Sequence, residues 1–170
     1  AEGNVYTGFL YAGLMIDKAG KPKVIEFNCR FGDPETQPIM CRLESSLVLL
    51  VEAALAKALD KVEATWDPRP TVGVVIAAGG YPADYSKGDV IEGLDAAAQL
   101  EGKVFHAGTA LKDGQIVTAG GRVLCATAIG RTVEEAQQQA YRLAEKIRWN
   151  GSFYRNDIGY RAIARERGEK

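Results

Sequence analysis

The chain has 170 residues, of which 46% are hydrophobic and 25% are charged, and its formal net charge is −1. These values are ordinary for a globular protein and give no electrostatic reason to expect a nucleic-acid or membrane partner. Three distant cysteines and a single histidine argue against a structural zinc site. Free thiols fit a cytoplasmic location, and no apolar run is long enough to span a membrane.

The first residues predict an antiparallel hairpin. Residues 6–17 are aromatic and aliphatic, residues 17–23 form a polar turn, and residues 24–28 return as a second strand. Because both faces of the pair are apolar, we expect the hairpin to be buried. The missing initiator Met and the early entry into a strand indicate a piece of a longer protein.

Two helices and a linker follow the hairpin. A proline-containing loop, residues 33–38, leads into the first helix, with Asp33 or Thr36 as its N-cap. Ser45 is expected to cap a second helix that ends near Leu59 and packs one apolar face. Polar residues and two prolines mark a linker at 63–70, so the predicted domains are 1–62 and 71–170.

The second predicted domain contains short β-rich runs separated by glycines and charged turns. Asp113-Gly114 predicts a tight hairpin turn. Thr132, with Glu135 three residues later, forms a capping box at the start of the clearest helix, which reaches about Ile147. The apolar stripe of this helix is predicted to consist of Val133, Ala136, Ala140, Leu143, Ala144 and Ile147. The pattern predicts an α+β chain: the remnant of one domain, followed by a small β-rich α+β domain.

One stretch, KVIEFNCRFGDPETQ at residues 23–37, concentrates the polar chemistry. Glu26, Asn28 and Arg30 alternate along the predicted strand, so their side chains should project from one face. A carboxylate and a carboxamide oxygen side by side are ligands that Mg²⁺ prefers, and an arginine beyond them suits phosphate. Spacing alone also fits a solvated strand face with one ion pair. The adjacent acidic segment, GDPET, counts against that simpler interpretation.

IEFNCRFGDPETQ resembles the final catalytic segment of ATP-grasp ligases, and specifically of the phosphoribosylamine–glycine ligase family. YTGFLYAGLMID, VGVVIAAGGYP, GGRVLCATAIG and RNDIG resemble that family in the same order. The resemblance therefore covers essentially the whole chain. It implies the C-terminal part of an ATP-grasp domain, with antiparallel strands and helices, followed by a small α+β C-terminal domain.

The resemblance also implies a reaction and its partners. The family joins glycine to 5-phosphoribosylamine at the expense of ATP, through a glycyl phosphate, in de novo purine synthesis. Glu26 and Asn28 match the Mg²⁺ or Mn²⁺ ligands, and Arg30 matches an arginine near the transferred phosphate. The substrate end of the cleft would hold Gly32, Asp33 and Glu35, whose two carboxylates would receive the glycine ammonium. Arg122, after Gly120-Gly121, is a candidate contact for the substrate phosphate.

Two departures from the ATP-grasp pattern qualify this expectation. Many such enzymes carry a further carboxylate ligand on the preceding strand, whereas GFLYAGLMI has none and Asp17 falls in the turn. The glycine-rich lid, its lysines and the N-terminal domain would lie upstream in the same protein. We therefore expect the chain to be inactive by itself.

Other conspicuous residues have structural interpretations. We expect Gly79-Gly80 to form a tight turn, and His106 to serve packing or surface polarity. The tyrosines and tryptophans are interpreted as core anchors, and Cys29 is expected to face the core. Two other functions stay open: another ATP-grasp ligase or carboxylase, and a non-enzymatic interaction domain.

Overall fold

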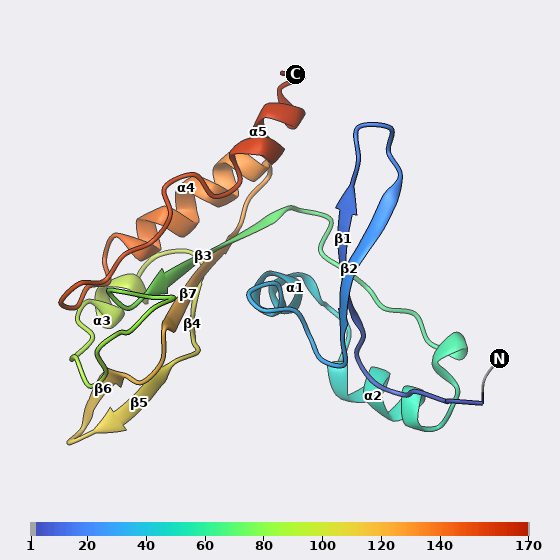
Figure 1. The fold of residues 1–170 in the computed structure, drawn as a ribbon, viewed down its shortest axis with the longest axis horizontal. Coiled ribbons are helices and arrows are strands. Elements are labelled where there is room, and N and C mark those ends of the chain that lie inside the picture. Colours follow the sequence, from blue (N-terminus) through green and yellow to red (C-terminus); the bar gives the residue numbers. More distant parts are fainter. Residues whose placement is uncertain (1–2, 170) are drawn as a thin grey trace. The chain divides into compact units, whose positions relative to one another are not determined.

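The computed structural model describes residues 3–169, which fall into two units (Figure 1). The first unit runs to Thr36 and includes Leu43–Asp67; the second contains Gln37–Arg42 and the chain from Pro68 onward. Helix α1 (Thr36–Arg42) thus begins in the first unit and continues in the second. The domains predicted from the sequence, 1–62 and 71–170, have other bounds than these units. That each of them folds independently stays a prediction.

The first unit contains the expected hairpin. Strands β1 (Tyr11–Ile16) and β2 (Pro22–Asn28) pair in antiparallel register. The register shifts after Gly13, which pairs with Glu26, because Ile25 is an extra residue in β2. Asp17 closes the turn, since its Oδ1 accepts hydrogen bonds from the amides of residues 19 and 21, each at 2.9 Å.

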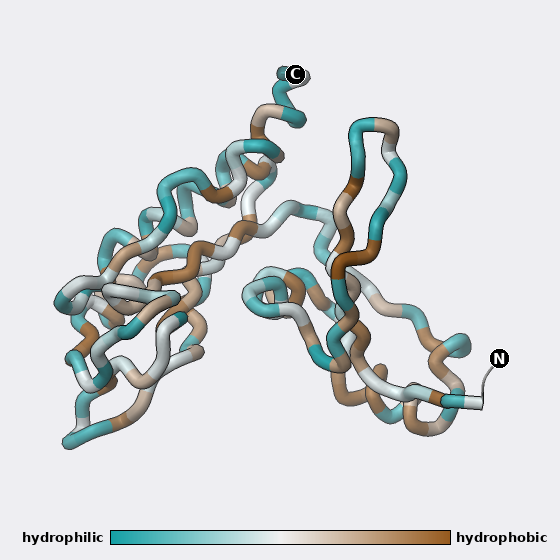
Figure 2. The backbone as a smooth tube through the Cα atoms, viewed as in Figure 1, coloured by the Kyte–Doolittle hydropathy of each residue, from teal (hydrophilic) through white to brown (hydrophobic). Residues whose placement is uncertain are grey.

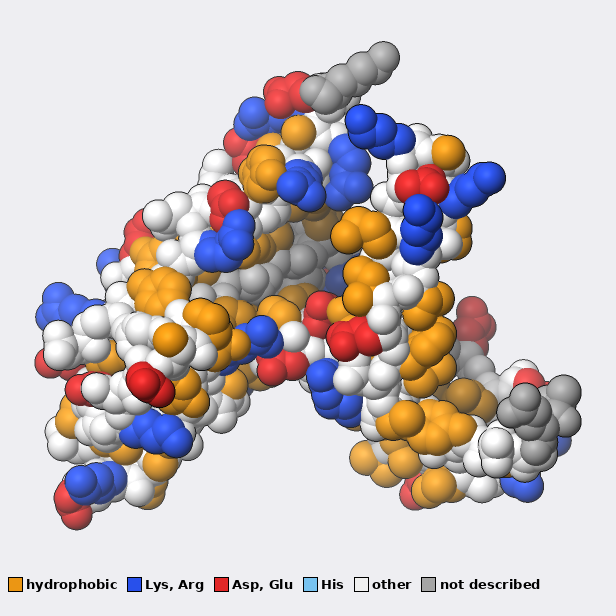
Figure 3. Space-filling model, in the orientation of Figure 1, with side chains coloured by type: hydrophobic (Ala, Val, Ile, Leu, Met, Phe, Trp, Pro, Cys, Tyr) orange, Lys and Arg blue, Asp and Glu red, His pale blue; other side chains and the backbone are white. Residues whose placement is uncertain are grey.

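The expected burial of this hairpin is wrong. Apolar side chains on both strands are exposed, including Ile25 at 64% and Phe27 at 59%. A two-stranded ribbon cannot cover its own faces, and the other described elements of the first unit do not form a layer over them. Figure 3 shows the hydrophobic side chains gathered on the surface of this unit.

A second helix and a short 3₁₀ turn complete the first unit. Helix α2 (Leu47–Leu55) is capped by Ser46, whose side chain accepts from the amide of Leu49, and not by Ser45 as expected. Ser45 instead accepts from the Thr65 amide at 2.7 Å. The helix ends before Leu59 because Lys57 has a positive φ of 55°. Its predicted apolar face is only partly buried, and η1 (Leu59–Lys61) follows it.

The second unit is built on a three-stranded antiparallel sheet. Its order is β3 (Thr71–Ala77), β7 (Arg122–Ile129) and β4 (Lys103–His106). Strands β5 (Thr109–Lys112) and β6 (Gln115–Thr118) form a separate hairpin. Its turn has positive φ at Asp113 (50°) and Gly114 (77°), which confirms the predicted tight turn.

Helix α4 (Val133–Ala144) supplies the main apolar layer against β3 and β7. The predicted stripe is confirmed, because its alanines and Leu143 join the side chains of β3 and β7 in one buried cluster. In Figure 2 hydrophobic colour follows the strands of the sheet, whereas α4 is largely hydrophilic with short hydrophobic segments between. The short helices α3 (Leu94–Ala97) and α5 (Tyr160–Glu166) lie beside α4. Within residues 3–169, no helix has both the length and the apolar content of a membrane span.

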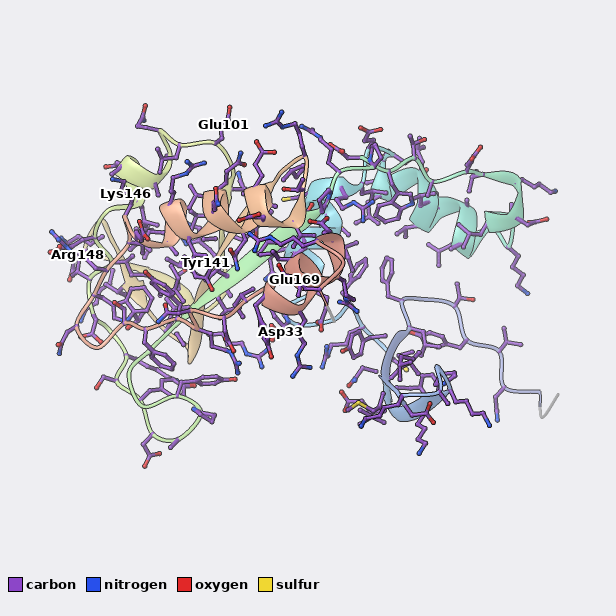
Figure 4. The ribbon with its side chains drawn as sticks, turned by 90° about the horizontal axis from the view of Figure 1, so that it is seen from above. Asp33, Glu101, Tyr141, Lys146, Arg148 and Glu169 are labelled. Atoms are coloured by element: carbon purple, nitrogen blue, oxygen red, sulfur yellow. The ribbon has the colours of Figure 1, made fainter. Side chains whose placement is uncertain are left out.

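Polar contacts fix both ends of α4. Thr132 caps the helix as predicted, accepting from the Glu135 amide at 3.1 Å, while Glu135 accepts from the Arg131 amide instead of closing the box on Thr132. Tyr141, labelled in Figure 4, donates to the carbonyl of Arg155 at 2.7 Å. These bonds attach the C-terminal segment to the helix.

The opposite face of the sheet receives the continuation of α1. Gly73 lies between the core residues Val72 and Val74 of β3 and so faces the other side of the sheet. A Cβ atom at this position would lie 3.0 Å from Pro38 Cγ and 3.1 Å from Cys125 Sγ. Pro38 therefore packs on the sheet where Gly73 leaves room for it. This contact explains why residues 37–42 belong to the second unit.

Leu143→Ala tests the α4–sheet core. Leu143 is 1% exposed, so its removal leaves a cavity and should lower the free energy of unfolding by about 2–5 kcal/mol. Leu111→Ala is the matched control, because Leu111 is 72% exposed and its loss should cost less than about 0.5 kcal/mol. Chemical denaturation followed by circular dichroism measures both. Equal costs would contradict the assigned core.

Candidate functional site

The proposed metal ligands lie at the end of β2. Glu26 pairs with Gly13 and Asn28 with Tyr11 across the hairpin, and the two side chains share one face because they are two residues apart. The Glu26 carboxylate makes no hydrogen bond or ion pair with any other residue in the described range 3–169. Its carboxylate is therefore uncommitted on an exposed strand.

Arg30 lies near Asn28 for a reason other than strand alternation. Strand β2 ends at Asn28, and residues 29–30 form a bend. The Arg30 guanidinium donates to the Phe31 carbonyl at 2.7 Å and reaches Asn28 Oδ1 at 3.5 Å, the outer limit of a hydrogen bond. The bend thus holds a positive charge beside the carboxamide oxygen.

The expectation for Cys29 is wrong, because this thiol is exposed. Alternation places Cys29 opposite Asn28, but the hairpin has no covering layer on that side among the described residues. The Cys29 side chain is therefore exposed on the surface and does not pack in a core.

A tight turn carries the acidic residues. The Thr36 amide donates to the Gly32 carbonyl at 3.2 Å, and the Thr36 hydroxyl donates to the same oxygen. Gly32 is buried, and a Cβ there would lie 2.5 Å from Glu35 Oε2 and 2.8 Å from the Tyr11 ring. A side chain at this position would displace both neighbours. Asp33 is exposed on the turn and is labelled in Figure 4.

Tyr11 is a site residue that the sequence analysis missed. Its hydroxyl donates to Glu35 Oε1 at 3.2 Å. The pKa of Tyr11 is raised chiefly by the negative charge of Glu35, with further contributions from this hydrogen bond, desolvation and the Glu26 carboxylate, while Arg30 opposes the shift. Tyr11 therefore lies within electrostatic range of three predicted site residues. The local sequence around a tyrosine in an apolar strand does not show whether its hydroxyl makes a hydrogen bond at a site or its ring only packs.

The donor set at the end of β2 fits a hard divalent cation. Glu26 offers a carboxylate, and Asn28 a carboxamide whose buried Nδ2 has no hydrogen-bond partner in the structure. The weak contact from Arg30 leaves Asn28 Oδ1 available to a ligand. Residues 3–169 contain no cluster of three or more His, Cys, Asp or Glu suited to a metal. A cation here would therefore complete its coordination with water and substrate oxygens.

The remaining candidates belong to the second unit. Arg122 begins β7, and its guanidinium lies 5.8 Å from the centre of the Tyr81 ring. Gly79-Gly80 forms the expected turn, in which a side chain at Gly79 would lie 2.8 Å from the Gly151 carbonyl. His106 is exposed, and its Nδ1 contacts the Thr109 hydroxyl at 3.0 Å, which agrees with a surface role.

Comparison with known families gives two matches. Residues 71–161 match the model described as phosphoribosylglycinamide synthetase, C domain, and residues 1–36 match the corresponding ATP-grasp (A) domain. Over 168 residues the chain is 89% identical to phosphoribosylamine–glycine ligase of Pseudomonas aeruginosa and 84% identical to that of Pseudomonas putida. Each alignment covers 99% of this chain but 39% of the relative, so the chain spans about two fifths of these proteins.

Solved structures confirm the fold class. Phosphoribosylamine–glycine ligase from Thermotoga maritima is similar with a TM-score of 0.78 and 43% identity, over 92% of this chain and 38% of that chain. N5-carboxyaminoimidazole ribonucleotide synthetase from the same organism has a TM-score of 0.55 and 17% identity, over 84% and 37% of the two chains, and shows a shared fold alone. The α+β architecture of a C-terminal ATP-grasp region is thus established.

Glu35→Gln should lower the pKa of Tyr11. The Glu35 charge disfavours the phenolate, so Tyr11 in the unchanged chain ionises above the ordinary tyrosine value of about 10, and the variant should ionise at lower pH. A raised pKa stabilises the fold below the unfolded-state value, and this contribution is lost as pH rises through the folded-state value. NMR titration of labelled tyrosines measures the shift, with Tyr11→Phe to assign the signal.

Glu52→Gln is the matched control for this titration. Glu52 is an exposed carboxylate of α2 and is not among the charges that shift Tyr11. An unchanged Tyr11 pKa in Glu35→Gln, or an equal shift in Glu52→Gln, would contradict the assigned contact.

Proposed function

The chain belongs to the phosphoribosylglycinamide synthetase family, and from this premise we propose that it is part of an ATP-dependent ligase that joins glycine to 5-phosphoribosylamine in purine biosynthesis. The observation that carries the proposal is the pair of oxygen donors, Glu26 and Asn28, with the Arg30 guanidinium beside them. Because the curated relatives are much longer, the activity belongs to the full-length parent.

The proposed reaction has two steps. A glycine carboxylate oxygen attacks the γ-phosphorus of ATP, so a phosphorus–oxygen bond forms, the bond to the β-phosphate oxygen breaks, and ADP leaves. The amine of 5-phosphoribosylamine then attacks the acyl carbon of glycyl phosphate. The carbon–nitrogen bond forms, phosphate leaves with the acyl bonding pair, and the amine loses a proton. Neither step needs a protein nucleophile.

The protein's part in these steps is positioning and charge neutralisation. Glu26 and Asn28 would hold Mg²⁺ or Mn²⁺, and this ion when bound would neutralise and orient the ATP phosphates. The Arg30 guanidinium would donate to oxygens of the transferred phosphoryl group. The uncommitted state of Glu26 and the weak Arg30–Asn28 contact support both roles.

Two further groups of residues are proposed to contact the substrates. Gly32 gives the acidic turn room beside Tyr11, and the carboxylates of Asp33 and Glu35 would receive the glycine ammonium. Arg122 would contact the phosphate of 5-phosphoribosylamine. A guanidinium suits that group because it pairs with two phosphate oxygens at once.

The rest of the parent protein is the proposed partner of the exposed hairpin. About three fifths of the length of these curated relatives lies outside the alignment with this chain. Strands β1 and β2 and helix α2 present exposed apolar side chains (Figure 3). We assign their covering layer to the upstream N-terminal and ATP-lid domains. A cytoplasmic location belongs to the same proposal and agrees with the three free cysteines.

Glu26→Gln and Asn28→Ala in the full-length parent should each lower kcat by about 10²-fold or more, because charge stabilisation at the transferred phosphate is lost. Asp17→Asn is the control, since Asp17 lies in the same hairpin and serves only its turn. ATP- and glycine-dependent phosphate release measures all three.

Unchanged activity in Glu26→Gln and Asn28→Ala would favour a non-enzymatic interaction role for this region. Phosphate release by the unchanged parent that responds to bicarbonate and not to glycine would instead select a carboxylase.

The isolated chain should show no glycine-dependent phosphate release, because it spans only about two fifths of the length of these relatives. Adding the separately produced upstream part should restore activity and reduce binding of a fluorescent apolar dye to the exposed hairpin. Glycine-dependent phosphate release by the isolated chain, measured at the same concentration, would contradict the proposal that the activity requires the rest of the parent protein.

A further inference from the structure

Tyr11 contacts both halves of the candidate site. Its backbone pairs with Asn28, which is one of the two proposed metal ligands on β2. Its ring lies next to Gly32, and its hydroxyl donates to Glu35 Oε1 at 3.2 Å. One side chain thus connects the strand that would hold the metal with the turn that would hold glycine.

The Glu35 carboxylate depends on this contact. Its Oε2 is buried without a hydrogen-bond partner in the structure, so the bond from Tyr11 to Oε1 is the side-chain contact that orients the group. Loss of the Tyr11 hydroxyl would leave both oxygens of this partly buried carboxylate without that side-chain hydrogen bond, which is costly for a charged group. Tyr11 and Glu35 are 24 residues apart in sequence, so the bond also closes the turn onto the hairpin.

We propose that Tyr11 is a positioning residue for the glycine subsite: its hydroxyl orients Glu35, and its ring supports the Gly32–Thr36 turn beside the metal ligands. The proposal rests on the proposed function, because it takes Glu35 as an acceptor for the glycine ammonium. Tyr11 itself does not touch the reacting atoms in this scheme. Its effect should therefore appear in the affinity for glycine and not in the transfer of phosphate.

Tyr11→Phe keeps the ring and removes only the hydroxyl. In the full-length parent it should raise KM for glycine by roughly 5- to 10-fold, the loss expected for one hydrogen bond to a charged group. The kcat, the KM for ATP and the Mg²⁺ dependence should change less than about 2-fold. Tyr6→Phe is the matched control, since it removes a hydroxyl of the same unit that donates to the Phe9 carbonyl.

A second readout does not depend on activity. The Thr36 amide is bonded to the Gly32 carbonyl, so its hydrogen exchange reports on the order of the turn. Tyr11→Phe in the isolated chain should speed this exchange several-fold, and Tyr6→Phe should leave it unchanged.

The two readouts separate the two hypotheses. If the unchanged parent releases no phosphate in response to glycine, the proposed function fails, while faster Thr36 exchange in Tyr11→Phe still supports the positioning contact. Unchanged KM for glycine together with unchanged Thr36 exchange overturns the inference. An equal rise in the KM values of ATP and glycine also overturns it, because that result indicates general damage to the site.

Discussion

The second unit depends on burial of one face of α4 against β3 and β7. Leu143 and the alanines of α4 leave almost no surface exposed there, and the strands contribute three valines, Ile76 and Leu124 to the same cluster. Burial of this kind stabilises the unit by roughly 25 cal/mol for each Å² of apolar surface removed from water. The first unit has no comparable layer within the described residues. The candidate site must therefore be held by backbone pairing and a few polar contacts.

The features predicted correctly from the sequence are mostly local. The Asp113-Gly114 turn needs two adjacent residues that tolerate positive φ, and the cap at Thr132 needs an acceptor three residues before an amide. The stripe of α4 needs only a helical period and a partner surface. The placement of Glu26 and Asn28 on one face follows equally from strand alternation. Each of these inferences uses interactions within a few residues.

The features predicted wrongly depend on where strands end and on contacts between residues that are distant in the sequence. Alternation could not show that β2 ends at Asn28, so Arg30 reaches the carboxamide from a bend and Cys29 faces outward. The apolar sequence of the hairpin predicts burial because it resembles an interior strand, yet burial needs a covering layer that the described residues of the first unit do not supply. The Tyr11–Glu35 bond spans 24 residues, and no local pattern announces it.

The charge at the candidate site favours cationic ligands. Glu26 and Glu35 bring two negative charges against one positive charge from Arg30. Like charges within a few ångströms repel, and this repulsion is only partly screened where side chains are half-buried. The structure tolerates it because Glu26 stays exposed and Tyr11 donates to Glu35. A divalent ion and the ammonium of an amino acid would each relieve this repulsion at a different carboxylate. Under the proposed function, an ion between these carboxylates and the ATP phosphates would reduce the repulsion between them.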